Sequence, residues 1–328
     1  MNILITGGTG FIGSRLALKC ASLGYDVKVL GQENTEAEKE NSSLLNKNNV
    51  KVILGSVLDT DIFTAALNGV DIVFHLAAAQ HEMNVPDQRF WDVNVTGTKN
   101  IIEASIKAGV KRFVHGSTIG VYGSMDGLID ENSPCNPTNI YGKTKLEGEK
   151  LVLSYSEKIP VTVIRIPETY GPGDRRLLKL FKGIQKKVFF VIGKGKNYHH
   201  LIFVDDLING FLLASEKPEA AGKVFLLAGP VPLTTNEMVS TIAESLGVKL
   251  PKFKIPLTPM LITATCMEKT LRPLGIQPPL HRRRMDFFVK SFTLSYEKAK
   301  KELGFNPGYS FSMGINETRD WYKESGLI

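Results

Sequence analysis

Tyr141 and Lys145 are the two residues whose types and spacing best suit acid–base chemistry. They stand four residues apart in the segment Asn139–Lys145, which we expect to open a helix, so their side chains share one helix face. A phenol titrates near ~10, and acting as an acid or base near neutrality requires a pKa shift of about three units, or roughly 4 kcal/mol. An ammonium group at ~4 Å supplies about 1 kcal/mol in water but nearer 4 kcal/mol at an effective dielectric constant of ~20. The pair therefore needs a partly desolvated position beside a charged cofactor, because on an exposed helix the same spacing is common by chance.

A glycine-rich loop follows the first apolar run of the chain. The segment Thr6–Gly13 reads TGGTGFIG and stands between Ile3–Ile5, an expected strand, and Ser14–Leu23, an expected amphipathic helix. Glycines in the turn let the backbone approach a pyrophosphate at the helix N-terminus, and Gly13 lets the helix pack close to the sheet. This order predicts a dinucleotide-binding loop, with a purely structural turn as the alternative.

The residues after the second expected strand bear on the choice between NAD and NADP. An acidic residue here holds the ribose hydroxyls of NAD, whereas an arginine favours the phosphate of NADP. Gly31 and Gln32 occupy these positions, and Glu33 follows close enough to reach a ribose. We therefore expect NAD, preferred by at most a few tens of fold or about 2 kcal/mol, with NADP as the alternative.

Short apolar runs alternate with amphipathic stretches in the first half of the chain. This pattern predicts an α/β fold, a doubly wound parallel sheet of the Rossmann type with right-handed crossovers. The expected strands are Asn2–Ile5, Val27–Leu30, Val50–Leu54, Ile72–His75, Phe113–His115 and Val161–Ile164.

Beyond Gly171 the sequence changes to proline- and lysine-rich segments with shorter elements. We expect residues 1–170 to form an NAD(P)-binding domain. Residues 171–196 and 231–328 are expected to form a smaller substrate-binding region. A strand and helix at His200–Ala214 are expected to return to the main sheet, so residues 197–230 are assigned to the first domain.

The composition is that of a globular protein with surplus positive charge. The 328 residues are 43% hydrophobic and carry a formal net charge of +7. No signal-peptide pattern opens the sequence, so we expect a cytoplasmic protein. Three widely spaced cysteines, with no histidine at ligand spacing, predict neither disulfides nor a metal site. The basic clusters indicate an anionic small-molecule substrate or merely solvated helix faces, and no nucleic-acid-binding module accompanies them.

The most apolar segment, Leu257–Leu271, is interrupted by Pro259, Glu268 and Lys269. It falls short of the roughly 18 uninterrupted apolar residues of a spanning helix, so we expect no membrane span. Its role stays open between an ordinary core helix and a surface helix suited to a membrane-proximal, lipophilic substrate.

Further motifs occur in the same order as in one protein family. They are His75–Ala78 (HLAA), Asn94–Thr98 (NVTGT), Ser117–Gly123 (STIGVYG), Tyr170–Asp174 (YGPGD), Phe203–Leu207 (FVDDL) and Lys298–Phe305 (KAKKELGF). Together with Thr6–Gly13 and Tyr141–Lys145 they span nearly the whole chain. The sequence therefore resembles the extended short-chain dehydrogenase/reductases, or epimerase/dehydratase family, and is similar to UDP-galactose 4-epimerase-like and 3β-hydroxysteroid dehydrogenase-like members.

The resemblance implies roles for individual residues, and also a homodimer. Tyr141 would be the general acid/base, and Lys145 would hold the nicotinamide ribose and lower the pKa of the tyrosine. Thr118 would hydrogen-bond the reacting oxygen, with Ser117 as the alternative. The expected cofactor-binding residues are Gly7, Gly10, Phe11, Ile12, Gly13, Gln32, Ser56, Val57, Leu76, Ala77, Ala78, Asn94, Tyr141, Lys145 and Pro167. The expected substrate-binding residues are Glu168, Arg175, His199 and Arg283.

Several positions depart from the family pattern. Nucleotide-sugar 4,6-dehydratases carry an Asp-Glu pair after the catalytic threonine, where this chain has Ile119 and Gly120, and neither can transfer a proton. Ser56 replaces an aspartate of the adenine-binding turn and leaves Asp59 as a helix cap. His199 replaces an arginine that binds the diphosphate in 4-epimerase-like members, and Arg175, Arg176, Arg283 or Arg284 could substitute for it. We therefore expect oxidation, reduction or epimerisation rather than dehydration.

Three functions fit these residues. The leading expectation is an NAD(P)-dependent oxidoreductase or epimerase that acts on a hydroxyl or keto carbon of a nucleotide sugar. The alternatives are a reductase or dehydrogenase of a lipophilic, steroid-like substrate and a non-catalytic NAD(P)-binding regulator. The intact set of Thr118, Tyr141 and Lys145 argues against the regulator.

Overall fold

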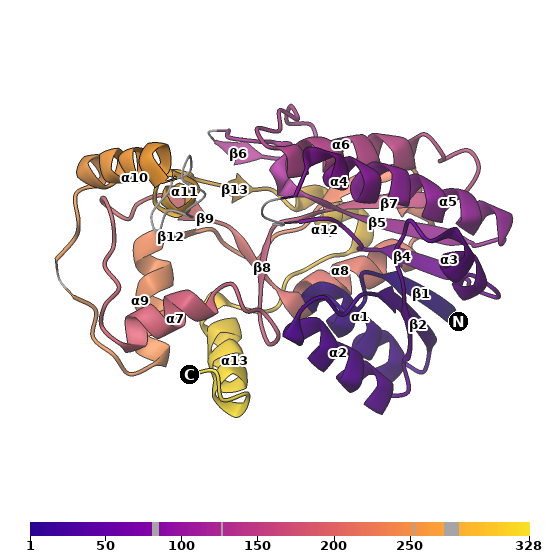
Figure 1. Cartoon of the computed structure of the whole chain (residues 1–328), viewed down its shortest axis with the longest axis horizontal. Coiled ribbons are helices and arrows are strands. Elements are labelled where there is room, and N and C mark those ends of the chain that lie inside the picture. The colour runs from indigo at the N-terminus through magenta and orange to yellow at the C-terminus, as the bar shows by residue number, and fades with distance from the viewer. Residues whose placement is uncertain (81–84, 126, 252, 272–281) are drawn as a thin grey trace.

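A seven-stranded parallel sheet forms the centre of the computed structural model, which describes residues 1–80, 85–125, 127–251, 253–271 and 282–328, the last range without the side chains of 282–284 (Figure 1). The strand order is β11-β7-β5-β4-β1-β2-β3, and every neighbouring pair is parallel. The order reverses between β1 and β4, so a crevice opens at the carboxyl ends of these two strands. This confirms the predicted doubly wound Rossmann architecture. The strands are β1 (Asn2–Thr6), β2 (Asp26–Gly31), β3 (Lys51–Leu54), β4 (Ile72–His75), β5 (Arg112–Thr118), β7 (Val161–Ile166) and β11 (Lys223–Leu226).

Helices cover both faces of this sheet because its strands are apolar on both sides. Ile3 and Ile5 point into one buried cluster, which the first group of helices covers, and Leu4 between them points into the other. The first group is α1 (Phe11–Ser22), α2 (Glu36–Lys47), α8 (Val204–Glu216) and α12 (Glu297–Leu303). The second is α3 (Thr60–Ala66), α4 (Asp87–Trp91), a π-helical turn (Asp92–Gly97), α5 (Thr98–Lys107) and α6 (Ile140–Leu153). As expected, Asp59 caps α3, accepting a hydrogen bond from the backbone N–H of Ile62 at 3.4 Å.

The remaining elements form a smaller lobe around an aromatic core that includes Phe181 and Tyr322 (Figure 1). Three two-stranded sheets connect it to the central sheet: β8 (Glu168–Tyr170) with β10 (Leu201–Phe203), β9 (Tyr198–His199) with β12 (Leu233–Thr234), and β6 (Leu128–Ile129) with β13 (Thr293–Leu294). Its helices are α7 (Leu178–Gln185), α9 (Thr235–Ser245), α10 (Leu257–Leu271), α11 (Arg282–Val289) and α13 (Phe311–Glu324). Short 3₁₀ turns lie at Ile119–Val121 and Pro218–Ala220.

The segment His200–Ala214 corrects one sequence-based expectation. Its helix, α8, packs on the central sheet, with Phe211 and Phe74 in edge-to-face contact at 6.2 Å. Its strand, β10, pairs with β8 and not with the central sheet. The seventh strand of the central sheet is instead β11, which was not among the strands expected from the sequence.

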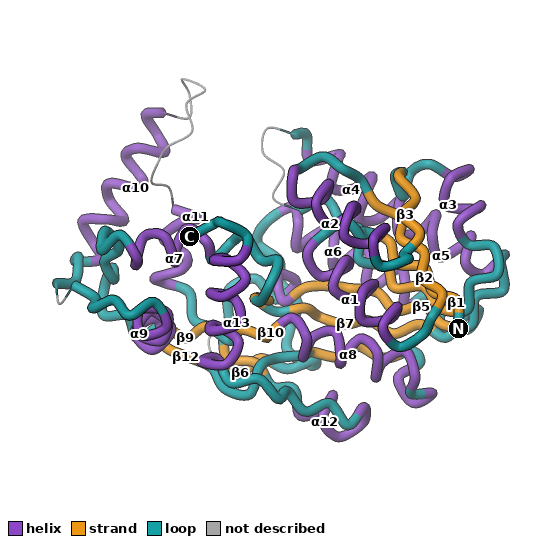
Figure 2. Tube along the Cα trace, turned by 90° about the horizontal axis from the view of Figure 1, so that it is seen from below, coloured by secondary structure: helices purple, strands orange, loops and turns teal. Residues whose placement is uncertain are grey.

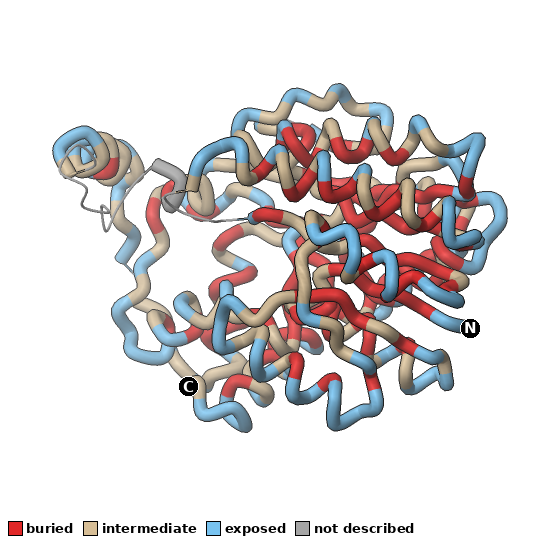
Figure 3. Tube along the Cα trace, turned by 45° about the vertical axis from the view of Figure 1, so that its right-hand side comes forward, coloured by how far each residue is buried: buried red, intermediate tan, exposed pale blue. Residues whose placement is uncertain are grey.

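The apolar segment Leu257–Leu271 forms α10, which is mostly exposed or half-buried (Figure 3). Its only buried residue is Ala264. The core-helix alternative is therefore wrong. In the described part of the chain, no helix is both long and apolar enough to cross a membrane.

Candidate active site

A cleft of about 490 Å³ opens where the strand order reverses, at the carboxyl ends of β1 and β4. Its walls come from the glycine loop, the end of β2, the segments after β4, β5 and β7, and the start of α6. Most residues expected from the sequence line it together: Gly7, Gly10, Phe11, Ile12, Gly13, Gln32, Ser56, Val57, Leu76, Ala77, Ala78, Ser117, Thr118, Tyr141, Lys145, Pro167 and Arg175.

The glycine loop has the geometry of a phosphate-binding turn. Gly7 has a left-handed backbone with φ of +70°, and a Cβ there would stand 2.7 Å from the backbone nitrogen of Ala77. A Cβ on Gly13 would stand 2.3 Å from the carbonyl oxygen of Gly7. α1 has no side-chain cap and no acidic residue in its first turn. Its positive end is therefore open to an anionic group in the cleft, so these residues fit the pyrophosphate of a dinucleotide.

The far end of the cleft corrects the expectation for Glu33. Gln32 lines this end, but the acidic residue beside it is Glu38 of α2, and Glu33 is not among the lining residues. The Glu38 carboxylate accepts hydrogen bonds from the backbone N–H (2.9 Å) and hydroxyl (3.1 Å) of Thr35, which form the N-terminal capping box of α2. Sequence distance from β2 therefore misplaced the carboxylate, because α2 turns back over the cleft.

Thr118, Tyr141 and Lys145 lie on one wall of the cleft. Asn139 fixes the start of α6, because its side-chain oxygen accepts a hydrogen bond from the backbone N–H of Gly142 at 2.8 Å. A Cβ on Gly142 would stand 2.5 Å from the carbonyl oxygen of Gly120, so only glycine allows α6 to approach the end of β5 this closely. This approach lets the side chains of Thr118 and Tyr141 form a hydrogen bond.

The electrostatics of the pair differ from the sequence expectation. Burial raises the pKa of Tyr141 to about 12, and the hydrogen bond with Thr118 and the charge of Arg176 oppose this only in part. Burial also lowers the pKa of Lys145 to about 8. The Lys145 ammonium donates to the carbonyl oxygen of Gly116 at 2.6 Å. Burial thus shifts both pKa values toward the neutral forms, but at about 8 the pKa of Lys145 still leaves this side chain mostly protonated at pH 7.

Ser117 is held by a buried ion pair behind this wall. Its hydroxyl donates to Glu149 at 2.9 Å, and Glu149 pairs with Arg165 at 2.5 Å. Glu149 and Arg165 are both buried, and the guanidinium of Arg165 also donates to the phenol oxygen of Tyr122 at 2.7 Å. Because the hydroxyl of Ser117 already has a charged partner, the geometry favours Thr118 as the residue that faces a substrate oxygen.

Asn94 does not line the cleft. Its buried amide accepts a hydrogen bond from the backbone N–H of Ala79 at 2.8 Å. The same amide donates to the carbonyl oxygen of Ala79 at 3.2 Å and to the hydroxyl of Thr144 at 3.0 Å. Asn94 therefore ties the segment after β4 to α6 and shapes the cleft from beneath.

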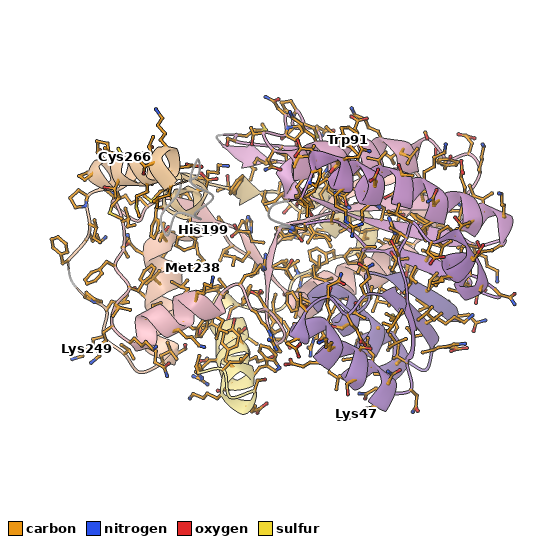
Figure 4. The ribbon with its side chains drawn as sticks, in the orientation of Figure 1. Lys47, Trp91, His199, Met238, Lys249 and Cys266 are labelled. Carbon is orange, nitrogen blue, oxygen red and sulfur yellow. The ribbon has the colours of Figure 1, made fainter. Side chains whose placement is uncertain are left out.

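The expected substrate residues are only partly brought together. Arg175 lines the cleft but forms an ion pair with Glu40 of α2. Glu168 and His199 lie beside the cleft in the smaller lobe, where the imidazole of His199 is 3.8 Å from the Glu168 carboxylate. Figure 4 labels His199 in this lobe. The side chain of Arg283 lies outside the described residues.

Two more arginines lie in the cleft, and of these only Arg176 was considered from the sequence, as a substitute for the missing diphosphate-binding arginine. Arg176 lines the cleft, donates to the Asp174 carboxylate at 3.0 Å and also donates to the carbonyl oxygen of Thr169. Arg89, on α4, also lines the cleft, and no sequence motif points to it. Among the described residues, no group of His, Cys, Asp or Glu side chains could hold a metal ion.

The chain is similar to known enzymes over nearly its whole length. It is 29% identical over 323 residues to N-acetyl-alpha-D-glucosaminyl-diphospho-ditrans,octacis-undecaprenol 4-epimerase of Escherichia coli O157:H7, covering 97% of this chain and 94% of the relative. It is 28% identical over 344 residues to 3 beta-hydroxysteroid dehydrogenase/Delta 5-->4-isomerase of Mycobacterium tuberculosis, covering 98% and 90%. Among solved structures, UDP-glucuronic acid 4-epimerase from Bacillus cereus in complex with NAD superposes with a TM-score of 0.81 at 25% identity, covering 99% of each chain.

A sequence model of the NAD dependent epimerase/dehydratase family matches residues 3–228. This range begins at the first strand of the central sheet and ends just after the last, so it includes every strand that bounds the cleft. The chain therefore belongs to the NAD dependent epimerase/dehydratase family and is an NAD-dependent enzyme of the extended short-chain dehydrogenase/reductase type.

Proposed function

We propose that this protein catalyses epimerisation or oxidation and reduction at a hydroxyl-bearing carbon of a sugar carried on a diphosphate, such as a nucleotide sugar. The observation that carries the proposal is the shared wall of Thr118, Tyr141 and Lys145, which lies in the same cleft as an open, glycine-lined helix N-terminus. A bound nicotinamide supplies a hydride acceptor and donor. The residues of the chain then have to manage one proton and hold the substrate in place.

Tyr141 is the proposed acid/base. When a substrate alcohol is oxidised to a carbonyl, the phenolate of Tyr141 takes the hydroxyl proton. When the carbonyl is reduced, the phenol of Tyr141 returns that proton. Thr118, hydrogen-bonded to Tyr141, orients the same substrate oxygen. Lys145 binds ribose hydroxyls of the cofactor. Since burial raises the pKa of Tyr141 to about 12, the positive charge of an oxidised nicotinamide has to favour the phenolate.

Two features support a sugar diphosphate as the substrate. Arg89 and Arg176 bring cationic side chains into the cleft, and guanidinium groups bind phosphate oxygens well. The relatives include enzymes named for sugars carried on undecaprenyl diphosphate and on UDP. Arg175 and His199 remain proposed contacts at the substrate end. Breaking the ion pair between Arg175 and Glu40 would free Arg175 for this role.

Ile119 and Gly120 support epimerisation or redox chemistry over dehydration. Ile119 packs in a buried cluster away from the cleft, and Gly120 has no side chain, so neither provides the second acid/base pair that loss of water requires. The experiment is to incubate the enzyme with UDP-, GDP- and dTDP-sugars and NAD, and to follow products by mass spectrometry and NMR. An epimer or a two-electron product supports the proposal, whereas a product lighter by one water contradicts it.

A steroid-like alcohol is the second candidate substrate. The 28% identity to the mycobacterial 3 beta-hydroxysteroid dehydrogenase, over 98% of this chain, is the observation that favours it. Hydroxysteroids with NAD or NADP belong in the same substrate panel. Turnover of a steroid without turnover of any sugar would select this candidate.

NAD is the proposed cofactor, with NADP bound more weakly. Glu38 lines the cleft together with Gln32, and a negative charge there disfavours an added ribose phosphate. Titration calorimetry with both cofactors tests this, and tighter binding of NADP would contradict it.

We also propose that the protein is a homodimer, and we keep the proposed division into a cofactor-binding domain and a substrate-binding region.

A further inference from the structure

Helix α10 leaves most of its surface uncovered. Leu257 and Leu261 pack against a small cluster with Ile192 and Met285, but Ala264 is the only buried residue of the helix. Figure 2 shows α10 projecting from the smaller lobe, and the label of Cys266 in Figure 4 marks it at the end of the molecule opposite the N-terminal sheet. An apolar helix in this position calls for an explanation, because such surface normally packs into a core.

Other exposed apolar side chains lie at the same end. Ile262 on α10 is 60% exposed, and Phe253, shortly before the helix, is 67% exposed. The segment that contains Val188 adjoins them, because the backbone N–H of Gly193 donates to the carbonyl oxygen of Ile255 at 2.8 Å. We call Val188, Phe190, Phe253 and Ile262 the apolar end face.

Three of the four threonines of α10 add little polarity to its surface. The hydroxyls of Thr263, Thr265 and Thr270 donate to the carbonyl oxygens four residues earlier, at 2.8 to 2.9 Å. Their hydrogen bonds are thus satisfied inside the helix. This part of α10 can leave water without stranding an unpaired hydroxyl donor.

The two chain segments that carry the apolar end face are almost entirely positive in charge. Residues 186–197 contain four lysines and no carboxylate, and residues 249–271 contain four lysines with Glu268 as the one acidic residue. The exposed lysines among them are Lys186, Lys187, Lys194, Lys196, Lys249, Lys254 and Lys269. In Figure 4, Lys249 is labelled at the outer edge of this end.

We propose that the apolar end face docks on the surface of an anionic lipid bilayer, with α10 lying in the headgroup region. Apolar side chains flanked by lysines are the composition of helices that bind membrane interfaces, and each cation gains from anionic headgroups. A second copy of the chain fits less well, because a symmetric contact would bring the two sets of lysines together.

The docked face would lie close to the substrate end of the cleft. α11 packs under α10, and its Phe287 ring contacts the His199 imidazole with 4.6 Å between ring centroids. His199 is next to Glu168, whose chain neighbours Pro167 and Thr169 line the cleft. A substrate anchored in the bilayer would therefore arrive beside the cleft. Docking itself does not depend on the activity proposed for the cleft.

The test is flotation of the full chain with vesicles, measured without substrate. Vesicles of 70% phosphatidylcholine and 30% phosphatidylglycerol should carry the protein upward at about 0.1 M salt, and pure phosphatidylcholine vesicles should carry much less. The double variant Phe253→Asp/Ile262→Asp should bind the anionic vesicles at least tenfold more weakly. Lys249→Ala and Lys269→Ala should each weaken binding about fivefold, the worth of one cation at an anionic surface.

The matched control is Leu44→Asp/Leu54→Asp, which adds the same charge at two exposed leucines of α2 and β3, on the other half of the molecule. This variant should bind vesicles nearly as well as the original chain. Thermal melts and NAD titration check that both double variants fold. Equal binding by the two double variants, or no flotation with anionic vesicles, would overturn the proposal. Self-association that Phe253→Asp/Ile262→Asp abolishes, without vesicle binding, would identify a second copy as the partner instead.

Discussion

Replacing Lys145 by methionine should stabilise the folded protein near neutral pH while it impairs the site. Lys145 is 2% exposed, and burial lowers its pKa from 10.5 to about 8. At 1.36 kcal/mol for each pKa unit, holding the charged lysine in the fold costs about 3 kcal/mol at pH 7. Methionine keeps the apolar stem but loses the hydrogen bond to Gly116, worth about 1 kcal/mol. The expected net gain for Lys145→Met at pH 7 is about 2 kcal/mol in the free energy of unfolding.

The pH dependence gives a sharper test, and its sign follows from proton binding. Between pH 8 and 10.5 the unfolded chain holds a proton on Lys145 that the folded chain has released, so stability of the original protein rises with pH in this window. The destabilisation of the folded protein by the charged Lys145 reaches its full value below pH 8 and disappears toward pH 10.5. Lys145→Met lacks this contribution, so its advantage of about 2 kcal/mol at pH 7 should shrink to about zero by pH 10.

The assay is urea unfolding of both proteins at pH 7, 8, 9 and 10, followed by circular dichroism. Groups such as Cys20, whose pKa burial raises to about 12, are common to both proteins and cancel in the difference. Lys145→Ala is not a suitable substitute, because it would open a cavity. The reasoning is refuted if Lys145→Met is the less stable protein at pH 7, or if the difference between the two proteins does not change with pH.

Three further changes test the cleft. Tyr141→Phe should lower turnover about 100- to 10,000-fold while calorimetry shows unchanged NAD binding, and full activity would exclude Tyr141 as the acid/base. Gly10→Val should remove NAD binding, because its side chain would block the approach of the pyrophosphate. The protein should still melt cooperatively, because a Cβ at Gly10 would stand 3.2 Å from the nearest atom of the chain. Gly13→Val should instead destabilise the fold, because a Cβ there would stand 2.3 Å from the carbonyl oxygen of Gly7. Arg165→Met should lower the free energy of unfolding in urea by about 3–5 kcal/mol, because Glu149 would remain buried without its partner, and a change below about 1 kcal/mol would contradict this.

The sequence predicted the central architecture because its strands have a simple pattern. Successive residues such as Ile3 and Leu4 point to opposite faces of the sheet, and both are apolar. Only a sheet covered by helices on both sides could bury them. The glycine loop was equally readable, since Gly7 and Gly13 occupy positions where a Cβ would meet backbone atoms. Both signals are local, and each follows from a few consecutive residues.

Features that depend on contacts between distant segments were not predicted. Arg89 reaches the cleft because α4 packs beside it, and Glu38 replaces Glu33 there because α2 folds back. The exposure of α10 could not be decided either, since a mainly apolar segment of this length is compatible with both a core helix and a surface helix. Sequence spacing predicts which residues share a helix face, but it does not predict which other segments of the chain pack against that face.

Burial has two opposing effects on the Tyr141–Lys145 pair, and sequence spacing does not reveal them. A dry site strengthens the effect of a charge on the tyrosine, but the same dryness lowers the pKa of the lysine that should carry the charge. Glu149 opposes this loss, because its negative charge favours the protonated lysine. Glu149 can stay buried and ionised only with Arg165 beside it. The buried ion pair behind the cleft wall, 16 residues apart in sequence and unmarked by any motif, therefore helps to keep a proton on Lys145 in a site that desolvation would otherwise discharge.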